Sequence, residues 1–431
     1  MKNWDGIPRK DGATMAIKGT RNPLVLKAVI LAVALQEIGG GAVAPVISTI
    51  ISENPQYAAA TVMLISTMPF LSIALTSAFY EHIERHFEKR ALTLFSIALF
   101  CLAGITPCML GDNIPLIIAM RFCFGIAVGC LVPMVMSLIN SFYKGKERAS
   151  MLGLVQTSGS IGGVAFQTIG GYLGAADWHY CFLAYFISLA VLAFAFFALP
   201  NPPATAARDE AGTGDDASSE KRYLAPTGKQ PRLPLGIVAS YLCLFVYMTC
   251  IITFVNNISI IVSESGYGGA EVAGLCLSAH TVTGMLAGVL YGPLFGKLRT
   301  FTLPITTLVG ALSLMIIYSS NSLTAIFAGS GLLGISAAAT LAGFFNSFSM
   351  REQGGSSRYT SLGVTVQFLG QFLGSFIIEI ILSITGGSFG HDAFLVASIA
   401  CMVAFAGISL LSVAEKGRVE AECRLTTEGT K

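Results

Sequence analysis

Residues 114–139 of the chain, IPLIIAMRFCFGIAVGCLVPMVMSLI, contain a single charged side chain, Arg121. A helix that crosses the ~30 Å hydrocarbon core of a bilayer needs about 20 mainly apolar residues, because each residue advances about 1.5 Å along the axis. This stretch is long enough. Gly125, Gly129 and Pro133 would weaken a helix in water, but membrane helices tolerate such residues. The sequence therefore predicts a transmembrane helix here.

The same composition extends over the whole chain of 431 residues. Hydrophobic residues make up 54% and charged residues 12%, and this charged fraction is about half of the ~25% typical of soluble domains. The composition excludes a soluble enzyme, a secreted disulfide scaffold and a disordered chain. Period-2 alternation is absent, which disfavours a membrane β-barrel. We predict an all-α membrane protein of twelve transmembrane helices, over residues 24–48, 58–80, 91–110, 114–139, 149–174, 180–199, 235–262, 272–292, 300–319, 323–348, 359–385 and 392–413.

The positive charges lie on one side of the predicted spans. The 26 Lys and Arg exceed the 24 Asp and Glu by only two, so nothing indicates a nucleic-acid partner. With twelve spans, every Lys and Arg falls in the tails or in the loops on the N-terminal side, except Lys27 and Arg121. Lys and Arg mark cytoplasmic loops. We expect a multi-pass protein of the cell (inner) membrane with both termini in the cytoplasm.

Residues 200–234 form the only long polar interior stretch, and their Pro, Gly, Ala and charge content indicates a flexible cytoplasmic linker. The stretches before the fifth and eleventh spans, 148–153 (RASMLG) and 358–363 (RYTSLG), resemble each other. Repeated halves are typical of transporters that bind substrate between them. We therefore expect two pseudo-symmetric six-helix bundles, over residues 24–199 and 235–413. The cytoplasmic tails are expected over residues 1–23 and 414–431.

The motif from Arg121 to Gly129, R-x-x-x-G-x-x-x-G, resembles a signature of the major facilitator superfamily, and the chain resembles this superfamily over essentially its whole length. The resemblance implies conformational roles for Gly125 and Gly129, and for Glu84 and Arg85 in the loop after the second span. That loop lacks the superfamily's glycine, whereas its counterpart in the second half keeps the glycine, Gly292, and loses the acid. The fifth span ends in FQTIGG, where drug antiporters have G-P-x-x-G-G.

Four ionisable side chains are candidates for proton coupling, because a charge inside a span costs roughly 3 kcal/mol or more. Glu37 lies near the middle of the first span, where desolvation favours the neutral carboxyl. By resemblance, Arg121 belongs either to a proton relay that includes Glu37 or to a clamp between helices. Glu379 is a second candidate proton site, and His280 titrates at about pH 6.5 when unperturbed. For each, hydrogen bonding to a neighbouring helix is the alternative.

Uncharged polar side chains inside the spans are the candidate substrate contacts, with helix packing as the alternative. Gln367 and Gln371 share one face of the eleventh span, and only one of the adjacent Asn256 and Asn257 is expected to line a cavity. Gln167 of the fifth span has the same two interpretations. The predicted substrate-binding residues are Gln36, Glu37, Gln156, Tyr247, Asn256, Asn257, Gln367 and Gln371.

The sequence contains no nucleotide-binding loop, no metal-ligand cluster and no nucleophile motif. We therefore expect no cofactor, no metal and no enzymatic activity, and transport driven by a gradient. The first hypothesis is proton-coupled efflux of a hydrophobic or amphipathic compound. Glu37 in the apolar first span supports it, and a polyanionic substrate is disfavoured because Arg121 is the only buried base. The alternative is uptake of a small solute, such as a monocarboxylate that pairs with Arg121. The expected partners are the substrate, protons and lipid, with the protein acting as a monomer.

Overall fold

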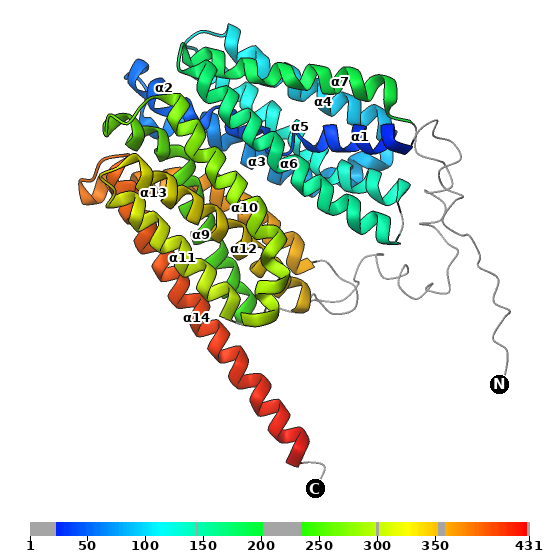
Figure 1. The fold of residues 1–431 in the computed structure, drawn as a ribbon, viewed down its shortest axis with the longest axis vertical. Coiled ribbons are helices and arrows are strands. Elements are labelled where there is room, and N and C mark those ends of the chain that lie inside the picture. Colours follow the sequence, from blue (N-terminus) through cyan, green and yellow to red (C-terminus); the bar gives the residue numbers. More distant parts are fainter. Residues whose placement is uncertain (1–22, 144, 201–233, 299–300, 352–357, 429–431) are drawn as a thin grey trace, which may run out of the picture.

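The computed structural model describes residues 23–143, 145–200, 234–298, 301–351 and 358–428. Within these ranges the chain is helical and contains no β-strand (Figure 1). The α-helices are α1 (Pro23–Ala34), α2 (Ile47–Glu53), α3 (Ala59–His86), α4 (Lys89–Ile105), α5 (Ile114–Phe142), α6 (Gly145–Gly174), α7 (Ile187–Ala198), α9 (Leu235–Glu264), α10 (Ala270–Leu298), α11 (Thr302–Tyr318), α12 (Leu323–Arg351), α13 (Arg358–Thr385) and α14 (His391–Glu428). Four 3-10 segments join them: η1 (Gly39–Ala42), η2 (Ala44–Val46), η3 (Thr106–Met109) and η4 (Trp178–Phe186).

Nine helical segments of the described chain are long and apolar enough to cross a membrane, and the bent first span is a tenth. The remaining two predicted spans are also helical. They are α11, which is apolar but has only 17 residues, and α6, which has 30 residues rich in glycine, serine and threonine. The all-α membrane fold predicted from the sequence is confirmed, and the helices agree with a count of twelve spans.

The first span is broken, whereas the sequence predicted one continuous helix over residues 24–48. The helix α1 ends at Ala34, and regular α-helix resumes only at Ile47 in α2. The two parts are bent by 51°. The sequence explains the break, because Gly39, Gly40 and Gly41 each cost a helix about 1 kcal/mol relative to alanine. Gln36 and Glu37 lie at this break.

The helices form two bundles, α1–α7 and α9–α14, which lie at an angle to one another (Figure 1). Each bundle has its own large cluster of buried apolar side chains. The predicted linker over residues 200–234 and the predicted tail over residues 1–23 lie almost entirely outside the described residues. The helix α14 continues to Glu428, well beyond the end of the predicted span at residue 413.

The two bundles contact each other at one end, which we call the closed end and define by Ser48, Gln167, Ser259 and Thr281. The amide of Ser48 donates to Ser259 Oγ at 3.2 Å, and Thr281 Oγ1 donates to Gln167 Oε1 at 3.0 Å. In Figure 1 the bundles meet near α2 and lie apart towards the end of α7. Hydroxyl and amide groups therefore make these contacts, and the rings of Phe70 in α3 and Phe368 in α13 also stack between the bundles, with centroids 6.3 Å apart.

Two glycines let α6 and α10 cross closely at the closed end. A Cβ atom on Gly171 would lie 2.6 Å from the carbonyl oxygen of Ala270, and one on Gly274 would lie 2.7 Å from that of Gln167. Beside this crossing, the hydroxyls of Thr168 and Ser278 are 2.8 Å apart. The backbones of the two bundles thus touch without intervening side chains, which requires glycine at both positions.

Asp177 caps η4, the 3-10 segment that begins the sixth span. Its carboxylate accepts hydrogen bonds from the backbone and the ring of His179, at 2.9 and 2.7 Å, and these bonds hold the pKa of Asp177 below its usual range. We expect Asp177→Ala to lower the free energy of unfolding by about 1 kcal/mol, the usual effect of losing an N-cap. Thermal unfolding of the purified protein tests this, with Glu53→Ala as the control because Glu53 is an exposed carboxyl that caps no helix. Equal effects of the two substitutions would contradict the capping role.

Candidate functional site

The Glu37 carboxyl lies at the break of the first span and is partly exposed. Its Oε1 atom is buried and has no hydrogen-bond partner among the described residues. The other oxygen, Oε2, lies 3.4 Å from the point where a Cβ atom on Gly159 of α6 would stand. The glycine therefore leaves room for the carboxyl against α6. Within the described part of the chain, Glu37 forms no ion pair.

Gln36 precedes Glu37 and is completely buried. Neither its amide nitrogen nor its amide oxygen has a partner among the residues that the structure describes. A buried amide without partners costs about 1–3 kcal/mol. Two adjacent polar side chains at the break are therefore both incompletely bonded, which is typical of a site that takes up a proton, water or ligand group.

Arg121 on α5 is also completely buried, but its contacts are with neutral groups. Nε donates to the carbonyl of Ile65 at 2.9 Å, Nη1 to the hydroxyl of Tyr185 at 3.0 Å, and Nη2 to the carbonyl of Gly40 at 3.3 Å. Its guanidinium also lies over the Phe124 ring, 4.2 Å from the centroid. The structure thus does not pair Arg121 with Glu37, and its contacts are those of a clamp between helices.

Two of the three acceptors of Arg121 are backbone carbonyls that lie at helix defects. In α3 the carbonyl of Ile65 would normally accept from the amide of residue 69, but this residue is Pro69, which has no N–H. The carbonyl of Gly40 belongs to the break of the first span. Pro133 in α5 likewise leaves the carbonyl of Gly129 without its helical donor. Ser77 Oγ of α3 donates to this carbonyl at 3.4 Å. Interhelical donors thus satisfy the defects that glycine and proline create.

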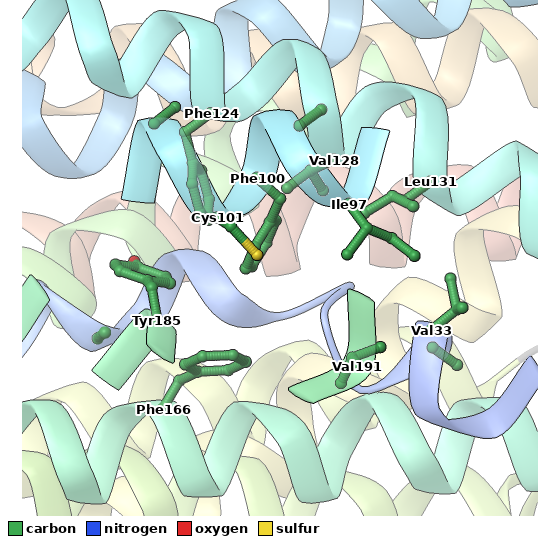
Figure 2. Packing of buried hydrophobic residues seen from close by; sticks show 14 of the residues in the cluster. Val33, Ile97, Phe100, Cys101, Phe124, Val128, Leu131, Phe166, Tyr185 and Val191 are labelled. Atoms are coloured by element: carbon green, nitrogen blue, oxygen red, sulfur yellow. The ribbon is translucent and has the colours of Figure 1, made fainter. Parts of the chain in front are cut away.

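Tyr185 of η4 is a site residue that the sequence analysis missed. Its hydroxyl accepts from Arg121 and donates to the carbonyl of Gly39 at 3.0 Å. Figure 2 shows its ring beside Phe100, Phe124 and Phe166 in the core of the first bundle. An aromatic residue in an apolar span gives no sequence signal of such a role.

Glu379 and His280 lie in the second bundle, on α13 and α10. Glu379 is partly exposed. The His280 ring packs against Phe254, with the centroids 5.1 Å apart, and its Nδ1 atom has no hydrogen-bond partner in the described chain. The four predicted proton-coupling residues therefore divide between the bundles, and no ion pair joins any two of them within the described residues.

Of the predicted substrate-binding residues, several are bonded within the second bundle. The Tyr247 hydroxyl is 2.7 Å from Ser336 Oγ. Asn257 donates to the carbonyl of Thr253 at 2.9 Å and accepts from the amide of Gly390 at 3.1 Å. These contacts support helix packing, the alternative interpretation of both residues.

The remaining candidates have free polar atoms. Asn256 donates to Ser375 Oγ at 2.8 Å, and its Oδ1 atom is buried without a partner in the part that the structure describes. Gln371 Oε1 is likewise buried without a hydrogen-bond partner among the described residues. Gln156 is exposed and Gln367 partly exposed. These four side chains keep the capacity to bind a polar group.

The predicted conformational residues lie at helix contacts or outside the described side chains. Glu84 accepts from Ser137 Oγ of α5 and forms an ion pair of 3.4 Å with Lys89. The side chain of Arg85 is outside the described part of the structure. Gly125 and Gly129 lie where α5 packs closely on α3, whereas a Cβ atom on Gly292 would meet nothing within 4 Å.

The comparisons with known proteins point to one family. A model of the Major Facilitator Superfamily matches residues 29–375. The structure is similar to a bacterial homologue of the human lysosomal transporter Spinster in an inward-facing, unoccupied conformation, with a TM-score of 0.70 and 14% identity over 90% of this chain and 96% of that chain. It is also similar to a D-xylose–proton symporter, with a TM-score of 0.69 and 15% identity over 89% of this chain and 96% of that chain. No curated protein sequence matches the chain.

Proposed function

The chain belongs to the Major Facilitator Superfamily, whose members are multi-pass secondary transporters, and from this we propose that it exports a hydrophobic or amphipathic small molecule in exchange for protons. The observation that carries the proposal is the Glu37 carboxyl, which lies at the break of the first span without an ion-pair partner among the described residues. A carboxyl in this condition can bind and release a proton without breaking a salt bridge.

Proton coupling requires only that protonation favours one of two conformations. A neutral Glu37 fits against α6 more readily than a charged one, because its buried oxygen has no donor to stabilise the charge. Protonation therefore favours the conformation in which Glu37 packs on Gly159. We propose Glu379 and His280 as further proton sites in the second bundle, and Gln36, Gln156, Asn256, Gln367 and Gln371 as substrate contacts.

The contacts of Arg121 support export over the alternative, uptake of a monocarboxylate. All three guanidinium nitrogens already donate, to Ile65, Tyr185 and Gly40. A substrate carboxylate could reach the two remaining guanidinium N–H groups only by entering a completely buried core. We therefore propose that Arg121 holds the helices and does not bind substrate.

We further propose that the bundles over residues 24–199 and 235–413 rock against each other as a monomer in the cell (inner) membrane. The described helix ends that lead into the Lys- and Arg-rich stretches of the sequence lie on the opposite side of the spans from the closed end, which favours a cytoplasmic location for both termini. The closed end then faces away from the cytoplasm, and the structure corresponds to an inward-facing conformation.

The proposal predicts that Glu37→Gln abolishes proton-driven transport, since glutamine cannot carry the proton. Everted membrane vesicles suspended in ethidium, an amphipathic cation, would be energised by an acidic interior, and dye accumulation inside them would be followed by fluorescence. Glu53→Gln is the matched control, because Glu53 lies exposed at the other end of the same span. We expect at least a tenfold lower rate for Glu37→Gln, and a normal rate for the control. Normal uphill transport by Glu37→Gln would refute the assignment.

The same vesicles distinguish the direction of transport. Efflux predicts that a pH jump which collapses the gradient releases the accumulated dye. If the everted vesicles leave the dye unmoved, while right-side-out vesicles take up lactate together with protons, the uptake alternative is favoured instead.

A further inference from the structure

The hydroxyl of Tyr185 lies between Arg121 and the break of the first span. This hydroxyl makes two hydrogen bonds. It donates to the carbonyl of Gly39 at 3.0 Å and accepts from Arg121 Nη1 at 3.0 Å. Arg121 in turn donates to the carbonyl of Gly40 at 3.3 Å. Two successive carbonyls of η1 are thus bound by one connected pair of side chains.

The ring of Tyr185 has little freedom to move. Three aromatic rings surround it, with centroids 5.6 Å (Phe100), 5.1 Å (Phe124) and 5.5 Å (Phe166) away. Gly104 of α4 allows the closest approach, because a Cβ atom there would lie 2.7 Å from the ring. The hydroxyl is therefore held at a defined point by packing from α4, α5 and α6 (Figure 2).

The bound segment is the one that carries Glu37. The Tyr185 acceptor, Gly39, is two residues from Glu37, and the amide of Gly39 donates to the carbonyl of Gln36 at 3.0 Å. On the opposite side, α6 presents Gly159 to the Glu37 carboxyl, and Gly162 to the carbonyl of Leu35. The polypeptide at the break is held between the Tyr185–Arg121 pair and the glycine face of α6.

We propose that Tyr185 is a positioning residue for proton coupling: through its bond to Gly39 it fixes the broken segment, and hence the place of the Glu37 carboxyl against α6. This rests on the proposed function, in which Glu37 carries the coupling proton. Among the described residues, the titratable side chains that hydrogen-bond to the broken segment are Tyr185 and Arg121, and the glycines of α6 have no titratable side chain.

The experiment compares Tyr185→Phe with Tyr241→Phe in full-length protein in lipid nanodiscs, so no substrate is needed. Tyr185→Phe keeps the packed ring and removes only the hydroxyl. Tyr241 is the matched control, because its hydroxyl also donates to a backbone carbonyl, that of Tyr359 at 2.9 Å, but in the second bundle. Two measurements are made: hydrogen–deuterium exchange of residues 35–46, and infrared titration of the carboxylic-acid band that Glu37→Gln removes.

For Tyr185→Phe we expect exchange in residues 35–46 to rise about tenfold, the effect of losing one to two hydrogen bonds. We also expect the midpoint of the Glu37 band to change by about half a pH unit or more, because the carboxyl changes its surroundings. Tyr241→Phe should alter neither. Unchanged exchange, or faster exchange with an unchanged midpoint, would overturn the positioning role. A wild-type Glu37 band that does not titrate between about pH 5 and pH 9 would instead refute the proposed function, and with it this role.

Discussion

Replacing Arg121 with methionine is expected to lower the free energy of unfolding by about 3 kcal/mol. The substitution keeps much of the side-chain volume but leaves the carbonyls of Ile65 and Gly40 buried without their donor. Each unsatisfied group costs about 1–3 kcal/mol. Removing a buried charge is neutral only when its partners are replaced as well. Here the partners are backbone carbonyls, which every variant retains.

Pro69 provides a sharper test, because it is the reason that the Ile65 carbonyl needs Arg121. Pro69→Ala restores an amide that can donate to Ile65 within α3. In a double-mutant cycle, Arg121→Met should therefore cost about 1 kcal/mol less in the Pro69→Ala background than in the wild type. Unfolding of each variant would be measured by titration with denaturing detergent.

Pro133→Ala is the matched control for this cycle. Pro133 also frees a carbonyl, that of Gly129, but Ser77 rather than Arg121 donates to it. We expect no coupling between Pro133→Ala and Arg121→Met beyond about 0.5 kcal/mol. Equal coupling for the two prolines, or additive effects for Pro69, would show that Arg121 does not act through the Ile65 carbonyl.

The sequence predicted the fold because apolar length and charge placement act over whole segments. The spans, the all-α membrane class and the family resemblance at Arg121 depend on such patterns, and the structure and the family match bear them out. The break of the first span had a visible signal in Gly39–Gly41. It was missed because membrane helices also use glycine for close packing, and the sequence does not distinguish the two uses.

The partners within the site could not be predicted, because they come from distant spans. Arg121 contacts Ile65, Gly40 and Tyr185, which lie 56, 81 and 64 residues away. The family resemblance suggested Glu37 as a companion of Arg121 in a proton relay, with a clamp between helices as the alternative. In the structure the guanidinium instead donates to neutral acceptors. Pro69 and the glycines at the break are the sequence features that could have indicated two of these acceptors.

Substituting alanine for Gly171 is expected to shift the transporter out of the conformation with a closed end, by about tenfold in the equilibrium. The new Cβ atom would lie 2.6 Å from the carbonyl oxygen of Ala270 and 3.2 Å from Cα of Gly274. Both are backbone atoms of α10, so no side chain can rotate away. Overpacking of this kind costs about 1–3 kcal/mol, and 1.4 kcal/mol corresponds to about a factor of ten.

The shift can be measured with a reporter at the closed end. Ser278 is 6% exposed and lies beside the crossing. In a Ser278→Cys background, a membrane-impermeant maleimide should react about tenfold faster when Gly171 is alanine. The control is Gly153→Ala on the same helix, because a Cβ atom there would meet nothing within 4 Å. Equal labelling rates in the two variants would contradict the close crossing.

Gly274→Ala tests the same crossing from the other bundle. Its Cβ atom would lie 2.7 Å from the carbonyl of Gln167, so we expect the same direction and a similar size of effect. Once either substitution has separated α6 from α10, the second has less contact left to disrupt, and the double variant should label far less than a hundredfold faster. Fully multiplicative effects would mean that the two glycines act at separate places. Because alternating access requires both conformations, each variant should also transport more slowly while remaining folded.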